Sequence, residues 1–211
     1  MAPRKPRTSR LTSRSGSASP PSPVPRVSLA LEAVARAAQR LKVPWYLFGA
    51  QAVALYGVPR TTADVDVTLL CDADVGVVLD ALRQSGIEPL VDDVAFIQRA
   101  RVIPARHPAS GWRLDVVLGG PGLEQQIAAE AVEMQIEKAR VPVLRLEHLL
   151  VLKVLAQRPQ NLADVARLLE VRGDVVRFDE VVELLSALEA GLEESGLVDA
   201  FERVRRSTPR R

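Results

Sequence analysis

Three aspartates in strand-like segments are the residues of this sequence best suited to do chemistry. Asp64 and Asp66 lie two apart in an apolar run, and Asp115 lies alone in another, over residues 112–118. Because side chains alternate across a strand, Asp64 and Asp66 point to one face. Such a pair repels and resists desolvation, so a fold keeps it when a cation lies between the carboxylates. Oxygen ligands of this kind suit Mg²⁺, and Asp115 would complete a two-metal site.

Residues suited to phosphate binding lie just upstream of the aspartates. Gly49 follows a short apolar strand and opens a helix, where backbone N–H groups and the helix dipole favour an anion. Arg60 and Thr62 occupy the loop that leads into Asp64, and a guanidinium matches the geometry of a phosphate. A phosphate-binding turn, a cation and two metal-binding acids within one short unit indicate phosphoryl or nucleotidyl transfer.

Each of these features also has a purely structural interpretation. Gly49 then serves only the conformation of a strand-to-helix turn. Asp64 and Asp66 then begin their strand beside a loop and pair with Arg60 or Arg113. A D-x-D pair alone is common, so the functional interpretation depends on the combination of these residues.

The elements that must position these residues are of two kinds. Apolar spacing and turn residues predict a mixed α/β segment, followed from residue 147 by helices alone. The fold class is therefore α+β. Helices are expected over residues 27–41, 50–56, 72–83, 123–137, 147–155, 162–170, 178–192 and 197–205. Strands are expected over residues 44–48, 64–71, 112–118 and 141–146, with further extended segments at 88–91 and 100–105.

The charge of the chain is divided unevenly. Residues 1–26 carry six basic and no acidic residues, and they are rich in Pro and Ser, which predicts a disordered tail. Between residues 27 and 202, 17 basic residues face 26 acidic ones, a net charge of −9. We therefore divide the chain into a basic tail (1–26), an α/β core (27–146), a helical region (147–205) and a second basic tail (206–211). The tails could contact nucleic acid through charge.

Composition excludes several classes of protein. No apolar run approaches the ~20 residues of a membrane span, and no signal-peptide core follows the N-terminus. A single cysteine, Cys71, excludes an internal disulfide and a cysteine zinc cage, and two histidines are too few for a histidine-rich metal site. A reducing cytoplasm fits this composition. A serine hydrolase is not supported, because the sequence holds no G-x-S-x-G.

The spacing of the motif residues resembles the nucleotidyltransferase superfamily of DNA polymerase beta type. Gly49-Ala50 precedes thirteen residues and then Asp64-Val65-Asp66, with Asp115 later in the chain. The loop reads R-x-T-x-D-x-D, from Arg60 through Thr62, and is similar to that of the nucleotidyltransferases of abortive-infection and type IV toxin–antitoxin systems. Ala50 stands where these proteins usually carry Gly or Ser.

A second, looser resemblance lies in the helical region. These relatives often show a helix with a lysine, followed by an Arg-x-Lys-Asp-x-x-Asp stretch, and Lys153, Arg158 and Asp164 fit that arrangement. Gln160-Asn161 stand where Lys-Asp is common. The alternative for Lys153 is a surface lysine that snorkels to solvent.

The resemblance implies a complete reaction. Asp64, Asp66 and Asp115 would bind two Mg²⁺ ions, with Mn²⁺ as a substitute, and Asp115 would orient or deprotonate the attacking hydroxyl. The substrate would be an NTP. Gly49, Ala50 and Arg60 would hold its phosphates, with Thr62 beside them, and Lys153 would offset charge on the leaving pyrophosphate. The acceptor implied is RNA, at the 3′ end of tRNA, in a toxin that arrests growth and has a cognate antitoxin.

Two other classes of protein remain open from the sequence. A non-catalytic or antitoxin-like binding module on the same fold would explain Ala50 and Gln160-Asn161, but the three retained acids argue against it. A glycosyltransferase also uses D-x-D to hold Mg²⁺ and a nucleotide-sugar diphosphate. Such enzymes usually place a longer nucleotide-binding unit before the motif than this chain has.

Overall fold

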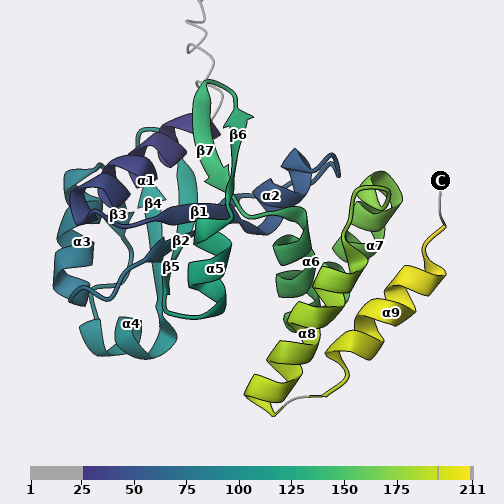
Figure 1. Cartoon of the computed structure of the whole chain (residues 1–211). Helices are drawn as coiled ribbons and strands as arrows, with labels where there is room; N and C mark the ends of the chain where they lie inside the picture. Colours follow the sequence, from purple (N-terminus) through teal and green to yellow (C-terminus); the bar gives the residue numbers. More distant parts are fainter. Residues whose placement is uncertain (1–25, 194, 210–211) are drawn as a thin grey trace, which may run out of the picture.

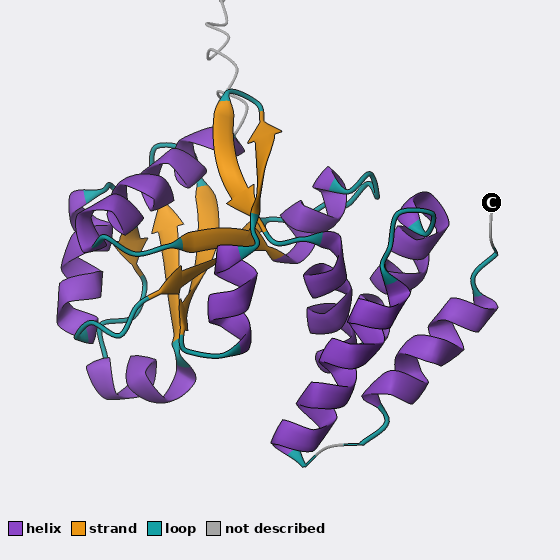
Figure 2. Cartoon of the chain, in the orientation of Figure 1, coloured by secondary structure: helices purple, strands orange, loops and turns teal. Residues whose placement is uncertain are grey.

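The computed structural model describes residues 26–193 and 195–209. The tail expected over residues 1–26 therefore lies outside the described residues, apart from Arg26. Within them, the chain forms a mixed sheet with flanking helices and a separate group of C-terminal helices (Figures 1 and 2). The α+β prediction is confirmed.

The sheet of the described residues has seven strands in the order β3-β4-β5-β2-β1-β7-β6. Its centre pairs β2 with β5 in parallel and with β1 in antiparallel orientation. The two strands that carry the acids are therefore neighbours. The strands are β1 (Trp45–Phe48), β2 (Asp64–Leu70), β3 (Glu88–Pro89), β4 (Val102–His107), β5 (Trp112–Gly119), β6 (Val132–Ile136) and β7 (Ala139–Val143).

Apolar residues of the strands and helices meet in one continuous core. In β2, Val65, Val67 and Leu69 are fully buried, on the face opposite to Asp64 and Asp66. Helix α1 packs its alanine- and leucine-rich face beside α3 and β7. The helices of this half are α1 (Val27–Leu41), α2 (Gly49–Leu55), α3 (Val75–Gln84), α4 (Val94–Ala100) and α5 (Leu123–Ala129).

One predicted helix is wrong in its second half. Residues 123–137 were expected to be helical, but α5 ends at Ala129 and Val132–Ile136 forms β6. This strand forms an antiparallel hairpin with β7. The hairpin turns at Glu137, which has a positive φ of 52° and accepts a hydrogen bond from the Ser28 hydroxyl at 2.6 Å.

The C-terminal helices pack against one another beside the sheet, to the right in Figure 1. Helix α6 follows β7 directly and is buried along most of its length. No helix of the described residues has the length and apolar character needed to cross a membrane. These helices are α6 (Leu146–Leu155), α7 (Pro159–Arg172), α8 (Phe178–Leu192) and α9 (Leu197–Ser207), so Arg206, assigned to the second tail from the sequence, is helical.

Candidate active site

The three acids lie at one place on the sheet. Asp66 in β2 is directly opposite Asp115 in β5, and Asp64 is opposite Arg113. Neighbouring strands lie about 4.8 Å apart and alternate residues of a strand about 6.6 Å apart. All three carboxylates are partly exposed. The register therefore brings Asp64, Asp66 and Asp115 to one face as a compact set of oxygen donors.

The first residues of α2 press their backbone against Asp66. Phe48, the last residue of β1, is the sheet partner of Asp66, and Gly49 follows with a φ of +69°. A Cβ atom at Gly49 would lie 1.9 Å from Oδ2 of Asp66. The next backbone N–H, that of Ala50, donates a hydrogen bond to the same carboxylate. Gly49 is therefore required both by backbone conformation and by close approach to an acid.

The surroundings of Asp66 disfavour its ionised form. Its burial raises the pKa above the ordinary 3.8, and the negative charge of Asp115 raises it further. The Ala50 N–H and the Lys153 ammonium act in the opposite direction but do not cancel these effects. Ionisation of Asp66 therefore costs free energy in the folded protein, and a bound cation would lower that cost.

Asp64 is fixed mainly through its backbone. The Thr62 hydroxyl accepts from the backbone N–H of Asp64 at 3.2 Å and donates to its carbonyl at 3.1 Å. Thr62 thus orders the start of β2. The Asp64 carboxylate lies 3.6 Å from Nε of Arg113, in a pair whose side chains are 46% and 69% exposed. An exposed pair of this kind contributes little to stability, and it leaves Asp64 accessible.

Two cations near the acids share one buried carboxylate. Asp164 of α7 is completely buried and lies 3.1 Å from Arg60 and 3.0 Å from Lys153. Arg60 comes from the loop before β2, and Lys153 comes from α6. Lys153 is only 9% exposed, so the surface-lysine alternative is wrong. Asp164 therefore joins two cations from separate parts of the chain at one point.

The same two cations contact the residues that depart from the family pattern. Asn161 accepts from the Lys153 ammonium at 3.2 Å. With its amide oxygen facing the guanidinium, Gln160 accepts from the two terminal nitrogens of Arg60 at 3.1 and 2.8 Å. The buried Nε of Arg60 has no hydrogen-bond partner among the described residues. These neutral amides contact the cations without neutralising them, and one buried donor of Arg60 stays unsatisfied.

Comparison of the whole chain with known proteins shows that its fold is a known one. No protein-family model matches the sequence, and no curated protein matches it either. Among solved structures, the antibiotic-resistance factor ANT(2'')-Ia is similar with a TM-score of 0.53 and 17% identity, over 79% of this chain and 92% of that chain. A nucleotidyltransferase-like protein from Paracoccidioides brasiliensis is similar with a TM-score of 0.51 and 18% identity, over 85% and 95%.

The chain has the nucleotidyltransferase fold. On this nucleotidyltransferase fold, the residues singled out from the sequence fall into three groups. Asp64, Asp66 and Asp115 share one face of the sheet, and Gly49 and Ala50 lie against Asp66. Arg60, Lys153 and Asp164 form the buried ion cluster. Thr62 supports Asp64 through its backbone, and Arg158 is exposed as the N-cap residue of α7.

Sequence reasoning assigns no role to Gln160 and Asn161 beyond their departure from the family pattern. They lie two and three residues after Arg158, but their contacts depend on how α7 packs on α6. A signal is present in the helical period: Asn161 and Asp164 are three apart and share a helix face. Lys153 could have been expected to meet that face, since it is the one cation of an apolar helix.

Proposed function

We propose that this chain is a metal-dependent nucleotidyltransferase that moves an NMP from an NTP to an acceptor hydroxyl. The observation that carries the proposal is the register that sets Asp66 directly opposite Asp115, with Gly49 pressed against Asp66. A purely structural strand would have no reason to keep two carboxylates side by side at the cost that the raised pKa of Asp66 records.

The acids fit a divalent cation of the Mg²⁺ class. They provide only oxygen donors, as this ion prefers, and the repulsion between Asp66 and Asp115 falls when a cation binds. Asp64, Asp66 and Asp115 would hold two such ions, with Mn²⁺ as a substitute. When bound, the ions supply charge neutralisation for the triphosphate and the acceptor oxygen.

The remaining residues have defined tasks in this reaction. The acceptor oxygen forms a bond to the α-phosphorus, and the bond from that phosphorus to the bridging oxygen breaks, so that pyrophosphate leaves. Asp115 orients the acceptor hydroxyl and takes its proton. We assign to Arg60 and Lys153 the task of offsetting the charge of the β and γ phosphates, and their ion pairs with Asp164 would keep both cations in place. Gly49 and Ala50 are assigned to the phosphates as well as to Asp66.

For the acceptor, we propose the 3′ end of an RNA, in a toxin-like enzyme with a cognate antitoxin. The R-x-T-x-D-x-D loop supports this choice, as do the basic residues of the tail, which could track a phosphate backbone. A second candidate is a small cationic molecule with a free hydroxyl. The similarity to an antibiotic-resistance factor favours it, as does the net charge of −9 over residues 27–202, which attracts cations.

The test is a transfer assay with both kinds of acceptor. Purified protein, Mg²⁺ and each labelled NTP are incubated either with total tRNA or with a panel of hydroxylated cationic antibiotics, beside an Asp64→Asn/Asp66→Asn control. Label on RNA that the control lacks supports the toxin-like enzyme, whereas label on an antibiotic supports the second candidate. Mg²⁺-dependent NTP binding without transfer to either acceptor would instead indicate a binding module.

A further inference from the structure

A second group of potential metal ligands lies apart from the three aspartates. Glu130 directly follows α5, His148 lies in the first turn of α6, and Glu180 lies in the first turn of α8. One donor atom from each of the three lies within 4.8 Å of the others. None of them belongs to the acid face or to the ion cluster around Asp164.

His148 is the unexplained member of this group. Its side chain is fully buried, and neither ring nitrogen has a hydrogen-bond partner among the described residues. Burial lowers the pKa of its imidazole, which favours the neutral form. A neutral imidazole that faces two carboxylates offers a lone pair to a metal. Left without any partner, the same ring is a costly buried polar group.

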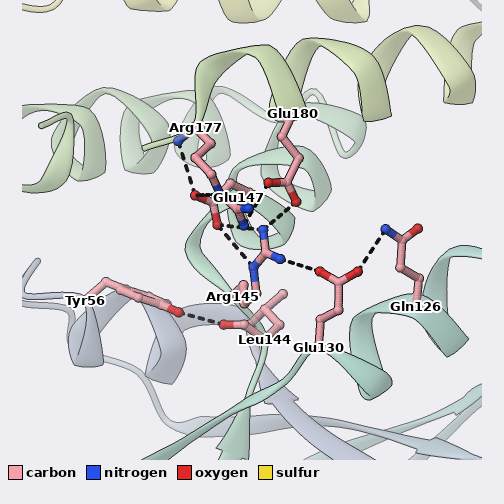
Figure 3. A network of polar contacts seen from close by, with 8 residues as sticks. All are labelled: Tyr56, Gln126, Glu130, Leu144, Arg145, Glu147, Arg177 and Glu180. Atoms are coloured by element: carbon pink, nitrogen blue, oxygen red, sulfur yellow. Dashed lines mark hydrogen bonds and ion pairs between the residues drawn. The ribbon is translucent and has the colours of Figure 1, made fainter. Parts of the chain in front are cut away.

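Arg145 holds the two carboxylates beside His148. It donates to Oε2 of Glu130 and to Oε1 of Glu180, and it also pairs with Glu147 at 3.2 Å (Figure 3). The other oxygen of Glu130 has only a Gln126 amide, at 3.2 Å. The other oxygen of Glu180 pairs at 2.8 Å with Arg177, a side chain that is 60% exposed. Each glutamate can therefore turn one oxygen toward His148 without losing Arg145.

The charges of the cluster also leave room for a cation. Glu130, Glu147 and Glu180 contribute three negative charges, whereas Arg145 and Arg177 contribute two positive ones. These five side chains sum to −1 in a half-buried place. A divalent ion would change this sum from −1 to +1, so the total stays small, and it would supply the missing partner of the imidazole.

We propose that Glu130, His148 and Glu180 bind one divalent transition-metal ion of the Zn²⁺ class, with water completing its coordination. One imidazole and two carboxylates suit Zn²⁺, whereas Mg²⁺ takes oxygen ligands alone. Ligands of Zn²⁺ lie about 2.0–2.2 Å from it, and small rotations of the two glutamates bring the donors that close. Arg145 acts as the outer-shell residue that orients both carboxylates. The ion ties α5 of the sheet half to α6 and α8.

The test must separate this ion from any bound to the aspartates. We therefore use the full chain with Asp64→Asn, Asp66→Asn and Asp115→Asn, and titrate it with Co²⁺ and then with Zn²⁺. One equivalent of Co²⁺ should give visible absorption bands that Zn²⁺ removes, and Zn²⁺ should raise the melting temperature. In the same background, His148→Gln should weaken binding by more than about 100-fold, beyond the usual effect of an outer-shell change.

The second histidine of the chain is a matched control. His107 is also buried, but its Nδ1 lies 2.8 Å from the Ser110 hydroxyl, and His107→Gln should leave the bands unchanged. Where His148→Gln does not fold, Glu130→Gln and Glu180→Gln give the same measurement with the imidazole intact. Absence of stoichiometric Co²⁺ binding in the parent overturns the proposal. Binding that folded His148→Gln or either glutamine variant retains overturns it equally.

Discussion

At the scale of single residues, Asp66 is the most constrained part of the proposed active site. It has a like charge opposite it in β5, a backbone N–H from Ala50 and no space beside Gly49. A side chain held in this way contributes to function at the expense of stability. Substitutions at Asp66 and Gly49 should therefore distinguish effects on activity from effects on stability.

Asp66→Asn should make the protein inactive and more stable near neutral pH. Activity should fall by at least about 100-fold, as when a group that stabilises transition-state charge is removed. Because the pKa of Asp66 is raised above 3.8 in the folded protein, the native state binds this proton more tightly than the unfolded state. Ionisation then costs stability as the pH rises from the unfolded pKa through the folded one.

The stability gain of Asp66→Asn should thus be complete near neutral pH and should vanish below the ordinary pKa. Urea denaturation of wild type and variant at several pH values measures the difference in the free energy of unfolding. A variant that is less stable than wild type at neutral pH would show that Asp66 is not held at a cost.

Gly49→Ala should damage both the fold and the activity. The new methyl group meets Oδ2 of Asp66 at 1.9 Å, in a backbone conformation with φ of +69°. We expect the free energy of unfolding to fall by about 1–3 kcal/mol from overpacking, and by a further 1–2 kcal/mol, roughly, from the left-handed conformation. Thermal melting and transfer activity are the measurements.

Gly111→Ala is the control for backbone conformation. Gly111 has a φ of +76°, and a Cβ atom at this position would have nothing within 4 Å. Gly111→Ala should therefore lose only the stability that the backbone conformation costs, and it should keep full activity. Equal losses at the two positions would mean that contact with Asp66 contributes nothing.

At the scale of elements, α7 completes a site that the sheet begins. Asp164 binds a cation from the loop before β2 and another from α6, and all three side chains are mostly buried. A buried carboxylate with two cations is a strong constraint on how α6, α7 and the loop pack. Removal of one partner leaves the others uncompensated.

Asp164→Asn should destabilise the protein by about 3–5 kcal/mol, because two buried cations lose their shared carboxylate. Addition of Lys153→Met should recover part of that loss, since one stranded cation is removed. Asp80→Asn is the exposed counterpart: Asp80 pairs with Arg83 at 3.3 Å on the surface, and its change should stay within about 0.5 kcal/mol. Strictly additive losses in the double variant would mean that Lys153 and Asp164 do not interact.

Comparison of sequence and structure shows which of these elements local patterns can predict. The strands around Asp64 and Asp115 were expected because both segments are short, apolar and rich in valine. Their register, which sets Asp66 opposite Asp115, depends on pairing between segments far apart in the chain. Val132–Ile136 was predicted as helix because it contains Glu, Met and Gln, which favour helices. Pairing with β7 overrode that preference.

Local sequence patterns could not predict the ion cluster or the group around His148 either, because both depend on contacts between segments far apart in the chain. Arg60 was expected to face phosphate, and Asp164 was expected only as part of a motif. That the two lie 3.1 Å apart follows from the packing of α7. In the sequence, His148 is only one of two histidines, too few for a histidine-rich metal site, and only the packing of α5 and α8 surrounds it with acids.

At the scale of the whole molecule, charge is divided between an acidic body and a basic N-terminal segment. An acidic body repels RNA, so an RNA acceptor would need the tail for affinity. A small cationic acceptor would need no tail.

Deletion of residues 1–25, which carry five basic residues, should therefore lower RNA affinity and reduce its salt dependence. Each lost phosphate contact should lower the salt slope by about 0.7 for a single strand. Binding to total tRNA at several salt concentrations measures both, and NTP binding should be unchanged. Unaltered RNA affinity would remove the tail from the proposed interface.

The contact between Arg60 and Asp164 also affects how the protein is made. Asp64 and Asp66 are translated early. Asp164, whose carboxylate pairs with Arg60 and Lys153, is not translated until about three quarters of the chain is made. At roughly 5–20 residues per second, the ribosome needs about 1–4 seconds to advance from Val143, the last residue of β7, to Asp164. In that interval the α/β half can begin to fold while Arg60 still lacks its carboxylate partner. During that interval the ion cluster of the proposed active site is incomplete, so a transfer reaction that needs Arg60 and Lys153 in place would begin only after Asp164 has been made.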